Sequence, residues 1–182
     1  MKRFVLIDRD GTINVEKHYL SDPDQLELYP GVGNAIRRLN MLGLGVVVVT
    51  NQSGIARGYF DLTRLEEIHD RLYRLLEAEG AMIDGLYICP HGPDDDCACR
   101  KPLPGMVTQA VADHHFDPAQ SFMIGDKEVD VEIGHAVGAK SFLVRTGHGH
   151  KFVEGTKADY VVDDLPQAVD VIEKMLACAS FS

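Results

Sequence analysis

Residues 44–49, with the sequence Leu-Gly-Val-Val-Val-Val, form the most β-branched stretch of the chain and limit what it can fold into. A continuous apolar run of this kind is typical of a central strand in a parallel sheet, which helices cover on both faces. Short apolar runs and amphipathic stretches alternate along the rest of the chain. Strands are expected at residues 4–7, 44–49, 85–89, 121–124, 141–144 and 160–162, and helices at 31–42, 61–80, 104–114, 129–137 and 165–176. Within the second helix, Thr63 and Glu66 have the spacing of a capping box. The alternation predicts an α/β fold.

The chain has 182 residues, which suits one domain of ordinary size. We therefore expect a single domain over residues 1–182, built as a Rossmann-like three-layer α/β/α sandwich with a mainly parallel sheet. No large insertion separates Gly11 from Gly31 or Gly85 from Arg100. The domain should accordingly lack a large cap over the end of the sheet.

The formal net charge of −10 restricts the partners of the protein. Sequence-independent nucleic-acid binding needs many Lys and Arg contacts to phosphates, so no nucleic-acid partner is expected. A small anionic substrate stays compatible, because it needs only local positive charge or a metal ion. No segment approaches the roughly 20 apolar residues of a membrane helix, and the apolar run after Arg3 is too short for a secretory signal. We expect a cytoplasmic monomer with no membrane partner.

Polar side chains follow four of the expected strands. In open parallel sheets, ligands bind outside the carboxyl ends of the strands. Each cluster alone is common in turns, helix caps or solvated surfaces. Their occurrence in order at successive strand ends predicts one shared site, made from Asp8 and Asp10, Thr50 and Asn51, Arg100 and Lys101 (after a long loop), and Asp126 and Lys127.

The chemistry of these side chains suits phosphoryl transfer. Asp8 is a candidate nucleophile, since aspartate can accept a phosphoryl group as an acyl phosphate. Asp10, two residues on, could protonate a leaving oxygen and then activate water. The carboxylates of Asp8, Asp10 and Asp126 would suit Mg²⁺, which prefers hard oxygen ligands. Thr50 and Lys101 could hold the phosphate oxygens, by a hydroxyl hydrogen bond and a positive charge.

A zinc-binding loop is predicted at residues 89–99. Cys89, His91, Cys97 and Cys99 lie within eleven residues, and a set of three thiolates and one imidazole is a standard tetrahedral zinc site with no open catalytic position. The alternative is a reduced loop with incidental thiols. Zinc would order a short polar loop that has no core of its own, and would hold the following basic residues against the site. Cys178, far away on the last helix, is expected to be an ordinary half-buried cysteine.

The order and wording of the motifs resemble the haloacid dehalogenase-like phosphatases over nearly the whole chain. The matching motifs are Asp8-Arg9-Asp10-Gly11-Thr12, Val49-Thr50-Asn51, Lys101 in Cys99-Arg100-Lys101-Pro102, and Gly125-Asp126-Lys127-x-x-Asp130. The resemblance implies that Asp8 is the nucleophile, Asp10 the acid and base, and Asp126 a Mg²⁺ ligand. It also implies that Asp10 binds the metal through its backbone carbonyl.

The zinc loop joined to Cys-x-Cys-Arg-Lys-Pro marks two close relatives within that superfamily, the heptose bisphosphate phosphatases and the histidinol phosphatases. Ser53 and Lys127 resemble the former, whereas the short zinc loop resembles the latter. The first resemblance implies hydrolysis of the C7 phosphate of D-glycero-D-manno-heptose 1,7-bisphosphate through an aspartyl phosphate, in nucleotide-activated heptose synthesis for the lipopolysaccharide core. Substrate contacts are then expected from Glu16, Lys17, His18, Tyr19, Thr50, Asn51, Gln52, Ser53, Arg100, Lys101 and Lys127.

Other functions remain open at this level. Histidinol phosphate or another small phosphosugar could be the substrate. A phosphotransferase would pass the phosphoryl group to an acceptor other than water. A non-catalytic, zinc-stabilised binding module is a third class, but it would not need Asp8, Asp10, Thr50, Lys101 and Asp126 all to be intact.

Overall fold

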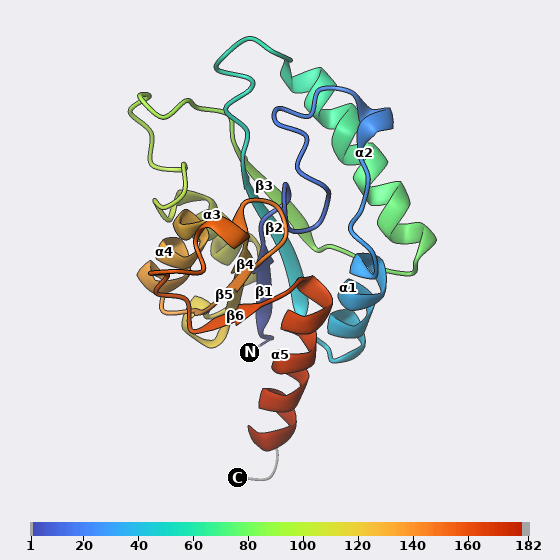
Figure 1. The fold of residues 1–182 in the computed structure, drawn as a ribbon, viewed down its shortest axis with the longest axis vertical. Coiled ribbons are helices and arrows are strands. Elements are labelled where there is room, and N and C mark those ends of the chain that lie inside the picture. The colour runs from blue at the N-terminus through green and yellow to red at the C-terminus, as the bar shows by residue number, and fades with distance from the viewer. Residues whose placement is uncertain (1, 180–182) are drawn as a thin grey trace.

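The computed structural model describes residues 2–179, which form one six-stranded parallel sheet flanked by helices (Figure 1). The strand order is β3-β2-β1-β4-β5-β6, and every neighbouring pair is parallel. The strands are β1 (Phe4–Ile7), β2 (Gly45–Asn51), β3 (Gly85–Cys89), β4 (Phe122–Gly125), β5 (Lys140–Val144) and β6 (Tyr160–Val162). The prediction of a parallel α/β fold is confirmed.

Helices cover both faces of the sheet, as the apolar central strands require. Their bounds are α1 (Val32–Met41), α2 (Leu62–Ala78), α3 (Gly105–His114), α4 (Glu128–Ala136) and α5 (Leu165–Ala179). Figure 1 shows α1 and α2 on one side of the sheet and α3 and α4 on the other. Short 3₁₀ turns lie at Pro23–Gln25, Pro118–Gln120 and Gly149–Lys151.

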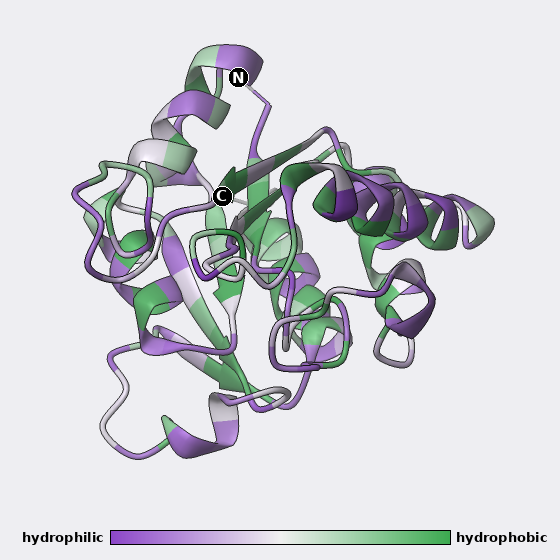
Figure 2. Cartoon of the chain, turned by 90° about the horizontal axis from the view of Figure 1, so that it is seen from above, coloured by the Kyte–Doolittle hydropathy of each residue, from purple (hydrophilic) through white to green (hydrophobic). Residues whose placement is uncertain are grey.

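Alternate residues of each strand supply two separate cores. Val46 and Val48 pack with side chains of α1, α2 and α5, whereas Val47 and Val49 pack with α3 and α4. Figure 2, viewed from above, shows hydrophobic residues along the strands and hydrophilic ones on the outer faces of the helices. The chain thus forms the three layers that the alternation predicts.

Two local expectations are corrected. Strand β2 continues through Asn51, so Thr50 and Asn51 belong to the end of the strand and not to the turn after it. The capping box of Thr63 and Glu66 was wrong: the N-cap of α2 is Asp61, whose carboxylate accepts a hydrogen bond from the Arg64 N–H at 2.8 Å. An Asp at this position already satisfies that terminal donor, so Thr63 lies within the first turn.

Among residues 2–179, no helix combines the length and the apolar composition that are needed to cross a bilayer.

Candidate active site

A cavity of about 610 Å³ opens at the carboxyl ends of the central strands. The loops that leave these strand ends lie at the top of Figure 1. Every residue that the sequence predicted for catalysis or substrate binding lines this cavity, except Lys17. The lining residues of that set are Asp8, Asp10, Glu16, His18, Tyr19, Thr50, Asn51, Gln52, Ser53, Arg100, Lys101 and Lys127, joined by Asp130 and His148.

Asp8 and Lys101 are in direct contact at the floor of the cavity. The Lys101 ammonium donates to Asp8 Oδ1 at 2.6 Å and to the Val49 carbonyl at 2.8 Å, and it lies 2.7 Å from Asp130 Oδ1. Burial alone would lower the pKa of Lys101, but the carboxylates of Asp130 and Asp8 together raise it above its ordinary value. Lys101 is therefore a fixed positive charge beside the predicted nucleophile.

Asp8, Asp126 and Asp130 are buried together, with one ligand atom of each within 4.8 Å of the others. Burial, with the charge of Asp8 added, raises the pKa of Asp126 to about 7. Its Oδ2 accepts the His148 N–H at 2.7 Å, whereas its buried Oδ1 accepts no hydrogen bond and lies 3.7 Å from the Lys127 ammonium. A Cβ at Gly11 would collide with the same carboxylate, so only glycine allows the backbone to pass this close to Asp126. Three buried carboxylates, one of them with an oxygen that accepts no hydrogen bond, fit a hard divalent cation such as Mg²⁺.

The side chain of Asp10 does not join this group, which corrects the expectation that its carboxylate would be a Mg²⁺ ligand. Its two oxygens accept hydrogen bonds from Arg9 at 3.0 and 2.8 Å, from Asn14 at 3.0 Å and from Gln52 at 2.9 Å. Burial opposes ionisation, but Arg9 and these hydrogen bonds outweigh it and lower the pKa of Asp10. The third carboxylate of the cluster is Asp130, which also accepts the Lys127 N–H at 3.0 Å.

Two side chains at and just after the end of β2, those of Asn51 and Gln52, hold other residues of the site in place by hydrogen bonds. The Asn51 side chain donates to the Lys101 carbonyl at 3.2 Å and accepts the Lys101 N–H at 3.0 Å, so it fixes the backbone that carries this lysine. Gln52 donates to Thr50 Oγ1 at 2.9 Å as well as to Asp10. Thr50 itself is buried at the cavity wall.

Glu16, Lys127 and His148 also line the cavity and lie close to one another. The Glu16 carboxylate lies 3.5 Å from the Lys127 ammonium and 3.6 Å from His148 Nε2. Burial opposes the charge of Lys127, but the acidic groups around it, first Asp8 and Asp126, raise its pKa. Lys17 does not line the cavity, and its ammonium lies 3.4 Å from Glu27, so the substrate contact expected of it stays a prediction.

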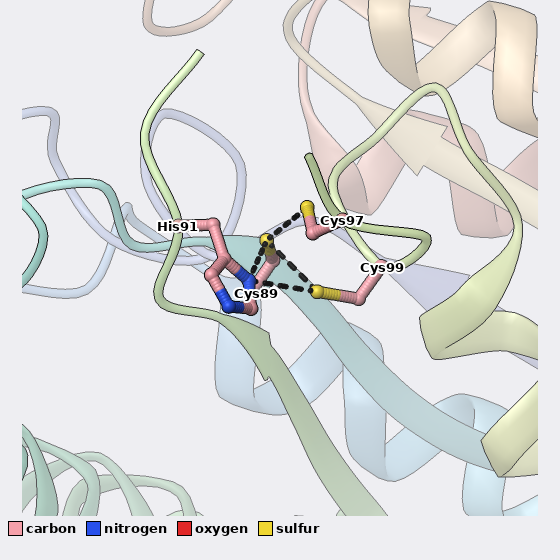
Figure 3. A group of neighbouring side chains, drawn as sticks. All are labelled: Cys89, His91, Cys97 and Cys99. Atoms are coloured by element: carbon pink, nitrogen blue, oxygen red, sulfur yellow. Dashed lines mark hydrogen bonds between the residues drawn. The ribbon is translucent and has the colours of Figure 1, made fainter. Parts of the chain in front are cut away.

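The four predicted zinc ligands converge, as Figure 3 shows. Cys89 Sγ lies 3.8 Å from Cys97 Sγ and 3.1 Å from Cys99 Sγ, and His91 Nδ1 lies 3.5 and 3.3 Å from Cys89 and Cys99. A zinc tetrahedron with Zn–S bonds of about 2.3 Å has S···S edges of about 3.8 Å. Burial raises the pKa of the Cys89 thiol to about 12, so a cation is needed to hold it as thiolate. The donor set fits zinc; the distance from Cys89 to Cys97 matches such an edge, and the distance from Cys89 to Cys99 is shorter than one.

Sequence reasoning missed several residues that support the site. The sequence assigned no role to Arg9, yet its side chain is fully buried and donates hydrogen bonds to the Asp10 carboxylate. Asn14 and His69 carried no pattern that would have marked them. His148 lies in a loop with no recognisable motif, and its backbone N–H donates to Asp126. The one signal available for Arg9 was its place as a cation between Asp8 and Asp10, directly after an apolar strand.

Comparisons with known proteins agree with this geometry. The HAD-hyrolase-like family model matches residues 98–168. The D-glycero-beta-D-manno-heptose-1,7-bisphosphate 7-phosphatase of Bordetella bronchiseptica is 38% identical over 178 residues, covering 97% of this chain and 96% of that protein. The enzyme of the same name from Haemophilus ducreyi is 40% identical over 179 residues, covering 94% of this chain and 98% of that one.

A solved structure shares the fold over nearly the full length. The crystal structure of D,D-heptose 1,7-bisphosphate phosphatase from B. bronchiseptica, complexed with magnesium and phosphate, gives a TM-score of 0.89 at 37% identity. It covers 95% of this chain and 99% of that chain. The chain therefore belongs to the D-glycero-beta-D-manno-heptose-1,7-bisphosphate 7-phosphatase family of the haloacid dehalogenase-like phosphatases.

Proposed function

We propose that this protein is a Mg²⁺-dependent phosphatase that removes the C7 phosphate of D-glycero-D-manno-heptose 1,7-bisphosphate and leaves the 1-phosphate. The observation that carries the proposal is the contact of Asp8 with Lys101 beside Asp126 and Asp130, at the floor of a cavity large enough for a phosphosugar. The relatives named for this reaction support the choice of substrate over histidinol phosphate.

The residues of the site divide the reaction into two steps. Asp8 attacks the phosphorus, so that a bond to its carboxylate oxygen forms while the bond from phosphorus to the sugar O7 breaks. Asp10, whose lowered pKa leaves it ionised in the free protein, takes up a proton from solvent in the substrate complex and gives it to O7. It then takes a proton from a water that attacks the aspartyl phosphate and frees Asp8. Lys101 holds a phosphate oxygen with its fixed charge, and the Thr50 hydroxyl is placed to donate a hydrogen bond to another.

The carboxylates of Asp8 and Asp126, with Asp130 beside them, would hold Mg²⁺ together with the backbone carbonyl of Asp10. When bound, the ion supplies positive charge that offsets the three carboxylates and the phosphate oxygens.

The zinc ligands have a structural task in this proposal. Four protein ligands leave no open position for substrate, so zinc would order the loop and fix Arg100 and Lys101, which follow Cys99. Thiolate ligands persist in a reducing compartment, which supports a cytoplasmic location. Every side chain used above comes from one chain, so we propose that the monomer is active.

The test is phosphate release from three substrates: the heptose bisphosphate, histidinol phosphate and fructose 1,6-bisphosphate. We expect the highest kcat/KM for the heptose bisphosphate, with release of one phosphate per sugar. A clear preference for histidinol phosphate would contradict the substrate assignment. Transfer of the phosphoryl group to an added alcohol without release of inorganic phosphate would contradict hydrolysis.

A further inference from the structure

Arg9 has no task in the two steps above, although it is a charged side chain with 0% exposure. Its Nη2 donates to both oxygens of Asp10, at 3.0 and 2.8 Å, and to Gln52 Oε1 at 3.1 Å. Its Nε has no hydrogen-bond partner. One end of the guanidinium is thus fixed by Asp10 and Gln52, and the orientation of its plane depends on what the other end contacts.

The other end contacts His69, which projects from the middle of α2. Arg9 Nη1 lies 3.0 Å from His69 Nε2. A guanidinium has no acceptor, so Nη1 must be the donor and Nε2 the acceptor. His69 is then a neutral imidazole with its proton on Nδ1. Burial, together with the charge of Arg9, lowers the pKa of His69 to about 3, in agreement with this assignment.

We propose that His69 is a positioning residue for Asp10 and acts through Arg9. This inference rests on the acid and base function proposed for Asp10. The Nε of Arg9 has no hydrogen-bond partner, so His69 provides the one contact at the Nη1 end of the guanidinium. Without His69, the guanidinium would rotate toward another acceptor. Because the same guanidinium holds both oxygens of Asp10, the rotation would move the carboxylate out of line with the leaving oxygen.

The leaving group of the substrate gives a readout that a purely structural task would not move. A sugar alkoxide is a poor leaving group and needs the proton from Asp10, whereas p-nitrophenolate departs without one. The constant kcat/KM reports the steps up to departure of the leaving group, before water attacks the aspartyl phosphate. Misplacing Asp10 should therefore lower kcat/KM for the sugar phosphate much more than for p-nitrophenyl phosphate.

The experiment compares His69→Leu, which removes the acceptor, with His69→Gln, whose amide oxygen can still accept from Arg9. Glu66→Gln, at an exposed position on the same helix, is the matched control. For the Leu variant we expect kcat/KM for the heptose bisphosphate to fall about tenfold or more, and that for p-nitrophenyl phosphate to change less than about threefold. The Gln variant should keep kcat/KM for the heptose bisphosphate within about threefold of the unsubstituted enzyme. The Glu66→Gln control should have the same kcat/KM values as the unsubstituted enzyme.

Two results would overturn the inference. Equal losses on both substrates for the Leu variant would mean that His69 supports only the fold, and no loss on either would mean that it does not position Asp10. The unsubstituted enzyme is assayed first on the heptose bisphosphate, which tests the proposed function separately. If that assay fails, another alkyl phosphate that the enzyme hydrolyses takes its place in the ratio, so the two failures are distinguishable.

Discussion

Replacing Arg100 with alanine should separate bisphosphate from monophosphate substrates. Arg100 lines the cavity, and its Nη1 donates to the His91 carbonyl at 3.1 Å, inside the zinc loop. That contact engages one of five guanidinium donors and leaves the others for an anion. We therefore expect Arg100 to bind the phosphate that does not react, while Lys101 serves the one that does.

The size of the effect follows from the contacts that would be lost. Hydrogen bonds to charged groups contribute about 1.5–3 kcal/mol, and about 1.4 kcal/mol corresponds to a factor of ten. The Arg100→Ala variant should thus lower kcat/KM for the heptose bisphosphate about 10- to 150-fold. A small monophosphate has no second phosphate, so its kcat/KM should change less than about threefold.

The assay measures phosphate release from both substrates under identical conditions, with zinc content determined for each variant. Arg145→Ala is the control, since Arg145 is exposed, pairs with Asp163 and lies outside the cavity. Equal losses on both substrates, with zinc retained, would refute the reasoning and place Arg100 at the reacting phosphate. Loss of zinc would instead show that the His91 contact maintains the loop.

Three further predictions concern the nucleophile, the zinc loop and pH. Asp8→Asn should lose more than about 99% of turnover with the fold retained, because an amide is not an anionic nucleophile. A higher residual rate, measured without contaminating phosphatase, would show that Asp8 is not the nucleophile. Cys97→Ser should lower both zinc content and the melting temperature, whereas Cys178→Ser should retain both; protein purified without chelator that contains no zinc would contradict the site. His69 has a folded-state pKa of about 3 against an ordinary value of 6.5, so the unfolded chain takes up its proton first and stability should fall as the pH drops below about 6.5. Between about pH 7 and pH 5, the free energy of unfolding of His69→Gln should fall by about 1 kcal/mol less than that of the unsubstituted protein, allowing for the partial exposure of His69. Urea unfolding measures both, and equal falls in the two proteins would show that His69 is not held neutral.

The fold was predictable because its signals are local. The valines of β2 alternate between two apolar cores, so their continuous run leaves little choice but a strand covered on both faces. The strand order places the ends of β1, β2 and β4 side by side. The polar residues at those ends therefore lie close together in one site. The convergence of Cys89, His91, Cys97 and Cys99 was predictable from their spacing within one loop.

The direction of individual side chains was not predictable in the same way. Asp10 is two residues from Asp8, and alternation along a strand suggested a shared face. The chain turns after β1, however, and the Arg9 carbonyl accepts the N–H groups of Thr12, Ile13 and Asn14. In that turn Asp10 meets Arg9 and Gln52 instead of the acidic cluster. His69 contacts Arg9 across 60 residues of sequence, and no local pattern marks such a pair.

The backbone of the zinc loop is joined to the end of β2. The Cys89 carbonyl accepts the Gln52 N–H at 2.7 Å, and Lys101, two residues beyond Cys99, pairs with Asn51 on the same strand. Zinc at the thiolates and an anion at the cavity floor would therefore both favour the same arrangement of residues 89–101. Thermodynamic linkage then makes their coupling reciprocal: whatever factor zinc contributes to the affinity for phosphate, phosphate contributes equally to the affinity for zinc. Saturation with substrate would then protect bound zinc against chelators, and removal of zinc would lower the affinity for substrate.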